Sequence, residues 1–207
     1  LFVLVEKAFA EKDYAGAEKS LVFLAAEAEA HGAASYWRGR IAEATRRDAV
    51  KAYREALGAQ PPFIGAAFEL ERIYVSRRQF REAIDVLESV SLVDTSPAGR
   101  VNLHVRLAAV WEESGDLVLA RRELERARRL DAGRADVAGA LVRVRERGRD
   151  LEGAIEICAE LVEMAGQRAN AENKMRELEA MRVRSMEGRQ DGAAEERDGG
   201  VGLFRRK

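Results

Sequence analysis

Cysteine and histidine are scarce in this chain of 207 residues, which has one cysteine, Cys158, and two histidines. A single cysteine excludes an internal disulfide and a zinc site built from cysteines, and it is compatible with a reducing compartment. His31 and His104 have no serine, cysteine or carboxylate at a spacing that would complete a nucleophilic or metal-binding set. A glycine-rich phosphate loop is also missing. We therefore predict no catalytic residue, no cofactor, no metal site and no enzymatic activity.

A dominant charge of one sign is absent as well. The chain carries 35 Lys and Arg against 36 Asp and Glu, which argues against a general polyanion binder. The segment 121–149 is locally rich in arginine, and contact with nucleic acid or anionic lipid through it is one open alternative. Acidic residues are interleaved there and stacking aromatics are missing, so a solvated surface, or one facing an acidic protein, is the simpler interpretation.

Long hydrophobic runs are missing too. The first apolar run, Leu1 to Val5, stops at Glu6 and Lys7, far short of the roughly 20 residues that a membrane-spanning helix needs. The chain opens on leucine rather than methionine, which leaves open an upstream anchor, signal or further repeat. We expect a cytoplasmic protein, or one tethered by a missing N-terminal segment.

Five short segments repeat one plan, in which a turn is followed by a helix with a small residue in its first turn. The small residues stand 32, 34, 37 and 34 positions apart (49−17, 83−49, 120−83, 154−120), a spacing that one helix pair fills. In each of these second helices, larger residues four and seven positions on fall on the same face. The small residues are Ala17, Ala49, Ala83, Ala120 and Ala154.

The repeats predict helix pairs with short turns between them. The glycine–aspartate order at Gly115-Asp116 and at Gly148 to Asp150 predicts a left-handed helix end followed by an N-cap. We divide residues 1–165 into repeats, with a capping helix at 167–187 and, because glycine and charge replace apolar residues, a disordered tail at 188–207. The repeats span about 1–30, 31–60, 61–96, 97–132 and 133–166, and their helix pairs are 1–12 with 14–30, 33–44 with 47–58, 63–76 with 80–92, 98–113 with 117–130, and 134–147 with 151–165.

The fourth segment carries the fullest pattern, Leu107-Ala108 and Trp111 followed by Gly115-Asp116 and Ala120. Two others carry parts of it, namely Leu70, Tyr74 and Ala83, and Ala49, Tyr53 and Pro61. Over residues 1–165 the chain resembles the tetratricopeptide repeat (TPR) family. The resemblance implies an all-α fold, a right-handed α-solenoid of about five helix pairs with a C-terminal capping helix, and a non-catalytic adaptor that holds a peptide segment of another protein.

The resemblance also implies which residues face the partner. In the second repeat, Trp37 and Gly39 compete for the small position, so Arg38 and Arg40 are rival groove residues, while Glu6 and Phe9 would begin the wall. The arginines suggest an acidic or C-terminal peptide as the partner rather than a small-molecule substrate. The alternative function is a regulatory or substrate-recruiting arm of a larger, possibly membrane-tethered assembly. The expected groove residues are Phe68, Glu69, Arg72, Asn102, Val105, Arg106, Arg143 and Glu146.

Overall fold

The computed structural model describes residues 2–25, 30–90, 96–163 and 168–199, with side chains up to Met186. Within these ranges every long regular element is a helix and no strand occurs, which confirms the all-α prediction. The chain divides into an N-terminal unit, Leu1–Ser114, and a C-terminal unit, Gly115–Lys207. The boundary falls inside the expected fourth repeat, 97–132, and assigns its two helices to different units.

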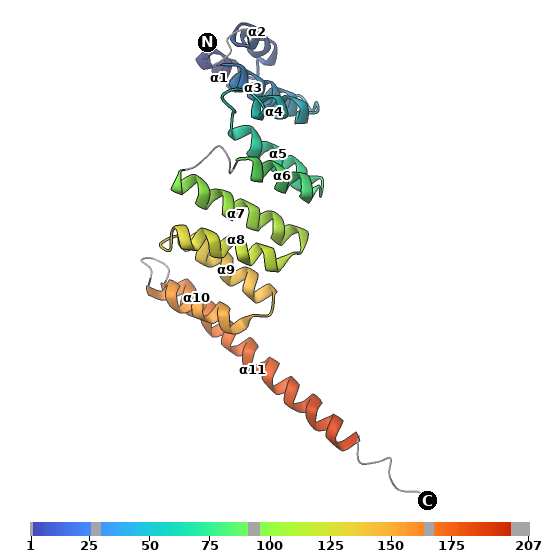
Figure 1. Ribbon diagram of the computed structural model, residues 1–207, viewed down its shortest axis with the longest axis vertical. Coiled ribbons are helices and arrows are strands. Elements are labelled where there is room, and N and C mark those ends of the chain that lie inside the picture. The colour runs from blue at the N-terminus through green and yellow to red at the C-terminus, as the bar shows by residue number, and fades with distance from the viewer. Residues whose placement is uncertain (1, 26–29, 91–95, 164–167, 200–207) are drawn as a thin grey trace, which may run out of the picture. The chain divides into compact units, whose positions relative to one another are not determined.

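The N-terminal unit contains antiparallel helix pairs in which a short turn joins α1 to α2, α3 to α4 and α5 to α6 (Figure 1). Consecutive helices pack on one another, because each buries an apolar stripe against its neighbour. Its helices are α1 (Phe2–Ala10), α2 (Tyr14–Leu24), α3 (His31–Ala44), α4 (Val50–Leu57), α5 (Gly65–Ser76), α6 (Phe80–Val90) and α7 (Pro97–Ser114).

The C-terminal unit continues the same plan and ends in a long helix (Figure 1). Helices α9 and α10 form a pair, and α11 packs on α10 through buried Ala171 and Leu178, as a cap would. Beyond Glu187 the helix continues to Gly199, through part of the segment predicted as disordered; the run Ala193-Ala194-Glu195-Glu196 there consists of good helix formers. Residues 200–207 of that segment lie outside the described residues. The helices are α8 (Leu117–Leu130), α9 (Ala135–Arg147), α10 (Leu151–Glu163) and α11 (Arg168–Gly199).

The small-residue register is confirmed by burial. Ala49 is 2 % exposed and the other four repeat alanines are fully buried, so each lets two helix backbones approach closely. The residues four and seven positions on, which share that face, are also buried, namely Leu21, Tyr53, Leu87, Leu124 and Cys158, then Leu24, Ala56, Val90, Ala127 and Leu161.

The turns follow the predicted chemistry with one correction. Asp116 accepts a hydrogen bond from the Leu119 backbone N–H at 3.0 Å, and Asp150 accepts one from Gly153 at 3.1 Å. Gly115 has a φ of 94°, as a left-handed helix end requires. Gly148 does not, because the left-handed residue of that turn is Arg149, with a φ of 62°. In both turns the left-handed residue stands directly before the capping aspartate. This left-handed residue is a glycine at position 115 and an arginine at position 149.

None of the helices in the described ranges combines the length and the apolar composition needed to cross a lipid bilayer.

Candidate functional site

The register of the first helices (α1, α3, α5, α7 and α9) decides which side chains share a face. Gly39 of α3 is buried against the ring of Tyr53, where an added Cβ would lie 2.4 Å from a ring carbon. Gly39 therefore occupies the small position of the second repeat, and the choice left open between it and Trp37 is settled. The corresponding residues are Glu71 in α5, Ala108 in α7 and Val142 in α9.

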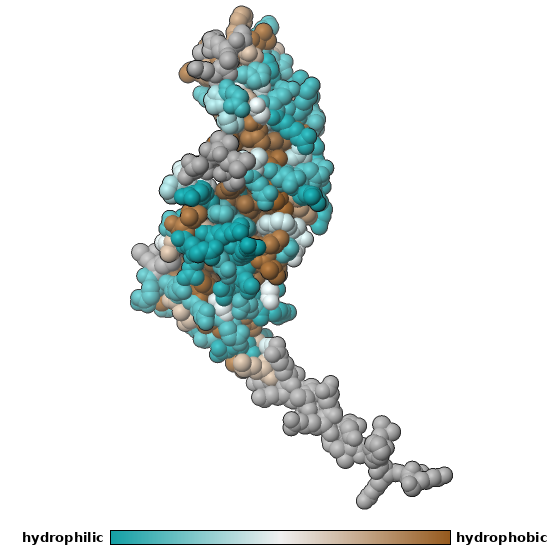
Figure 2. Space-filling model, in the orientation of Figure 1, coloured by the Kyte–Doolittle hydropathy of each residue, from teal (hydrophilic) through white to brown (hydrophobic). Residues whose placement is uncertain are grey.

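Three residues before this position, each first helix of repeats two to four carries a large apolar side chain. These are Tyr36, Phe68 and Val105, and all three are half-buried. Residues at one register on successive first helices form a row along one face of the unit. On the face drawn in Figure 2, hydrophobic and hydrophilic residues are interleaved rather than gathered into one broad apolar patch.

The predicted groove residue Arg106 is paired within the chain. Its guanidinium forms an ion pair with Glu71 and lies 4.2 Å from the centroid of the Phe68 ring, so it connects α7 to α5. Glu71 stands where the repeat pattern calls for a small residue. Burial raises the pKa of its carboxyl, while Arg106 acts in the opposite direction by stabilising the charged form.

Arg72 connects α5 to α3 in the same manner. It pairs with Glu43 and, at 3.1 Å, with Glu69 of its own helix. The hydroxyl of the buried Tyr53 donates a hydrogen bond to Glu43 at 2.7 Å. Burial, together with that hydrogen bond, raises the pKa of Tyr53. Arg72 and Arg106 are therefore held in place by carboxylates of the protein itself.

Arg40 is also held within the chain, but its direct contacts are with aromatic side chains. Its guanidinium is 5.4 Å from the Phe9 ring centroid and 5.9 Å from those of Tyr36 and Trp37, and it donates to the Tyr36 hydroxyl at 3.1 Å. The sequence named Arg40 only as a rival of Arg38. If Gly39 had been fixed as the small position, the sequence would have favoured Arg40 over Arg38, because Arg40 lies at helical spacing from Tyr36 and Trp37.

The remaining predicted groove positions of this unit are more open to solvent. Asn102 and Glu6 are exposed, and Phe9 is half-buried under Arg40. The N-terminal unit thus presents a half-buried apolar row bordered by arginines whose positions are fixed by neighbouring first helices.

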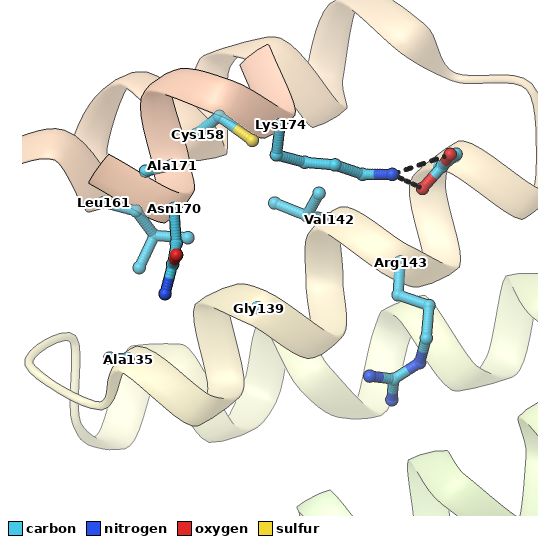
Figure 3. Close-up of a pocket in the computed structure, with 10 residues that line it drawn as sticks. Ala135, Gly139, Val142, Arg143, Cys158, Leu161, Asn170, Ala171 and Lys174 are labelled. Carbon is cyan, nitrogen blue, oxygen red and sulfur yellow. Dashed lines mark hydrogen bonds and ion pairs between the residues drawn. The ribbon is translucent and has the colours of Figure 1, made fainter. Parts of the chain in front are cut away.

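In the C-terminal unit, the two predicted groove residues Arg143 and Glu146 line one pocket of about 360 Å³ between α9, α10 and α11 (Figure 3). Val142, Cys158, Leu161 and Ala171 supply its apolar lining, and Ala135, Gly139, Asn170 and Lys174 complete it. Sequence reasoning missed Asn170 and Lys174, because it treated α11 only as a cap. Cys158 is buried, and burial raises the pKa of its thiol, which favours an unreactive form.

Lys174 crosses the pocket from α11 to α9 (Figure 3). Its ammonium lies 2.8 Å from a Glu146 carboxylate oxygen and 3.3 Å from one of Glu177. Burial alone would lower the pKa of Lys174, but these two carboxylates outweigh it and raise the pKa. Arg143 starts from α9 below Lys174, and its guanidinium points away from Lys174 (Figure 3).

At least five of the ten arginines in the segment 121–149 have acidic partners within the C-terminal unit. Arg126 contacts Glu123 at 2.6 Å, Arg145 contacts Asp150 at 3.3 Å, and Arg128 pairs with Glu160. Arg121 and Arg134 also have acidic partners. Because these charges are neutralised locally, the pairing supports a solvated surface over a nucleic-acid interface. Among the described residues, no cluster of three or more His, Cys, Asp or Glu side chains is arranged to hold a metal ion.

Comparison of the structure with solved structures places the chain in a fold class. It has the all-α solenoid fold of TPR proteins. No family model and no curated protein sequence matches the chain.

The individual similarities are long but distant in sequence. A MamA structure from Desulfovibrio magneticus RS-1 is 18% identical with a TM-score of 0.58, over 78% of this chain and 90% of that one. PilF of Pseudomonas aeruginosa is 18% identical with a TM-score of 0.59, over 92% of this chain and 85% of PilF. YrrB, a TPR protein with an unusual peptide-binding site, is 18% identical with a TM-score of 0.57, over 86% of this chain and 84% of YrrB.

Proposed function

We propose that the protein is a non-catalytic interaction scaffold that holds a peptide segment of another protein against its first-helix faces. The observation that carries the proposal is the half-buried row Tyr36, Phe68 and Val105, at one register on three successive first helices. Apolar side chains left half-exposed in a row supply the contact area that an extended or helical segment buries on binding.

The fixed arginines support the same function. Arg40, Arg72 and Arg106 are already held by rings or carboxylates of neighbouring helices, so a ligand that contacts them loses little side-chain entropy on binding. The carboxylate partners of Arg72 and Arg106 also reduce the net charge that these two residues offer to a ligand. We therefore assign affinity in this unit to the apolar row, and orientation of the peptide to the arginines.

Site-specific photo-crosslinking tests the proposal in cells that make the protein. A photoreactive residue replaces Asn102 or Val105 on α7, or, as a matched control, the exposed Ser89 on the second helix α6. We expect covalent adducts with a partner protein at 102 and 105 and none at 89, with the crosslinked fragment mapping to one segment of the partner. Equal adducts at all three positions, or none at 102 and 105, would contradict the proposal.

Positions 102 and 105 are better sites than the arginines for testing partner binding. Replacing Arg106 by glutamate would set a second carboxylate against Glu71 and destabilise the unit itself.

A further inference from the structure

The first helix pair leaves several large apolar side chains open to solvent. Of the eight such side chains that are exposed in the described residues, four lie in α1 and α2. Because the two helices are antiparallel and joined by a short turn, the start of α1 lies beside the end of α2. All four residues lie at this end of the pair, and we name them the N-terminal apolar patch: Val3, Leu4, Val22 and Phe23.

The repeat register shows that Leu4 belongs to a position that is normally covered. Val5 is fully buried and precedes Ala17 by 12 residues (17−5), as the residue at the small position precedes the repeat alanine in α7 and α9 (120−108, 154−142). Leu4, directly before Val5, is 56% exposed. The leucines directly before the small position in later first helices are all buried, namely Leu70, Leu107 and Leu141.

The difference between these leucines follows the packing of their helices. Helices α5, α7 and α9 each pack on the second helix of the preceding repeat, whereas no helix precedes α1 in the described residues. Leu4 therefore has the side chain of an internal repeat position without the neighbour that an internal repeat provides.

The contribution of α2 departs from the repeat pattern in the same direction. Val22 and Phe23 stand five and six residues after Ala17. Seven of the eight residues at these positions in the other second helices are polar or charged, so the packing within a repeat does not require an apolar pair there. They are Arg54 and Glu55, Glu88 and Ser89, Glu125 and Arg126, and Ala159 and Glu160. A terminal repeat that is exposed to water has a polar outer face, and the patch is the opposite.

Two features of the chain indicate that a second copy covers the patch. The C-terminal repeat is already covered by α11 through Ala171 and Leu178, so head-to-tail stacking of copies is blocked at that end. The charges of residues 2–24 nearly cancel, with four acidic and three basic side chains (3 − 4 = −1), so two identical patches meet without strong repulsion. An apolar surface of low net charge is complementary to itself.

We propose that the N-terminal apolar patch binds the same patch of a second copy and forms a twofold-symmetric dimer. Such a contact uses identical surfaces on both chains, so it is complete with two copies and does not continue into a filament. The patch shares no residue with the row Tyr36, Phe68 and Val105, so each copy keeps its first-helix face for a peptide.

Sedimentation velocity of the full chain, from about 1 μM to about 1 mM, tests the proposal. The key variants are Leu4→Glu and Phe23→Glu, which place a carboxylate in the apolar contact. Both side chains are exposed in the single chain, so the variants should keep the helical circular dichroism of the parent. Val183→Glu is the matched control, because Val183 is an exposed apolar residue of α11 outside the patch.

We expect the parent to form dimers and no larger species. The dissociation constant should rise at least about tenfold for Leu4→Glu and for Phe23→Glu, and stay within about twofold for Val183→Glu. A parent that stays monomeric at every concentration, or two patch variants that dimerise as tightly as the parent, would overturn the proposal. Dissociation by Val183→Glu would also overturn it and would show that the patch contacts α11 of the other copy. Species that keep growing with concentration would contradict the twofold contact.

Discussion

The two units differ at one register position of their first helices, three residues before the small position. The N-terminal unit has Tyr36, Phe68 and Val105 there, whereas the C-terminal unit has Gly139 and no side chain. The cations that join helices in the two units differ in the same way. Arg72 and Arg106 reach carboxylates beside that filled row, whereas Lys174 reaches Glu146 across an open pocket. The same repeat plan therefore yields a closed apolar row in one unit and a cavity in the other, depending on a single side chain per helix.

The composition provides a separate probe for each unit. Both tryptophans, Trp37 and Trp111, all four tyrosines and every phenylalanine except Phe204 lie in the N-terminal unit, while the only cysteine, Cys158, lies in the C-terminal unit. Tryptophan fluorescence and thiol protection of Cys158 therefore follow the unfolding of the two units independently.

The two mid-helix glycines should show the largest difference. Gly39→Ala should cost about 3 kcal/mol of unfolding free energy, because the new methyl overlaps the Tyr53 ring. Gly139→Ala should instead stabilise by about 0.5–1 kcal/mol, because the methyl enters open space and alanine favours the helix. Denaturant melts followed by tryptophan fluorescence for the first variant and Cys158 protection for the second measure both effects. Destabilisation of similar size at both sites would remove the contrast between the two units.

Removing Arg106 should have the next largest effect. Arg106→Ala leaves Glu71, whose side chain is 13% exposed, without its cation and should cost about 2 kcal/mol. Lys174→Ala, at a more open pair, should cost about 0.5–1 kcal/mol. Because burial holds the pKa of Glu71 above its usual value, its ionised form destabilises the folded state above that pKa, so the deficit should shrink as the pH falls toward about 4.

The double variant Glu71→Ala/Arg106→Ala is the control for this pair. It puts the expected small residue at position 71 and leaves no buried carboxylate, so it should be more stable than Arg106→Ala in chemical melts. If the double variant is the less stable of the two, Glu71 contributes packing that its charge does not explain.

Tyr53→Phe should change the free energy of unfolding by a smaller amount, and the sign of this change depends on pH. At about pH 8 the lost hydrogen bond to Glu43 should cost about 1 kcal/mol. The pKa of Tyr53 is raised in the folded state, so its neutral form contributes stability that is complete below the unfolded value of about 10 and is lost as the pH rises further. The variant should therefore lose less stability than the parent above pH 10. Cys158 protection should depend on pH identically in both proteins, because the C-terminal unit has no tyrosine.

The smallest effects should come from turns that both units share. Arg78 and Arg149 have φ values of 58° and 62°, which cost strain that glycine avoids. Arg78→Gly and Arg149→Gly should each stabilise by about 0.5 kcal/mol, less than the full strain because glycine also loosens the unfolded chain. Gly115→Ala should destabilise by a comparable amount. Calorimetric melting temperatures that fall in the two arginine variants would show that the arginine side chains support these turns.

Local sequence signals predicted the helix pairs well and the site residues less completely. Ala120 and Asp116 identified a helix start because small residues and N-caps act within one turn of the chain. The role of Glu71 could not be predicted from the sequence, since its partner Arg106 is 35 residues away and only packing brings the two together. Lys174 and Asn170 were overlooked for the same reason: nothing local to α11 shows that it completes a pocket with α9.

The sequence by itself determined the repeat period, the helix pairs and the buried small-residue register of this protein, because these depend on periodicity and capping within about one helix pair. Only the tertiary structure decided that Gly39 rather than Trp37 takes the small position, that Arg72 and Arg106 are held by the protein's own carboxylates, and that Gly139 opens a pocket under α11. These features depend on which side chains from different repeats meet, and a one-dimensional pattern does not contain those distances.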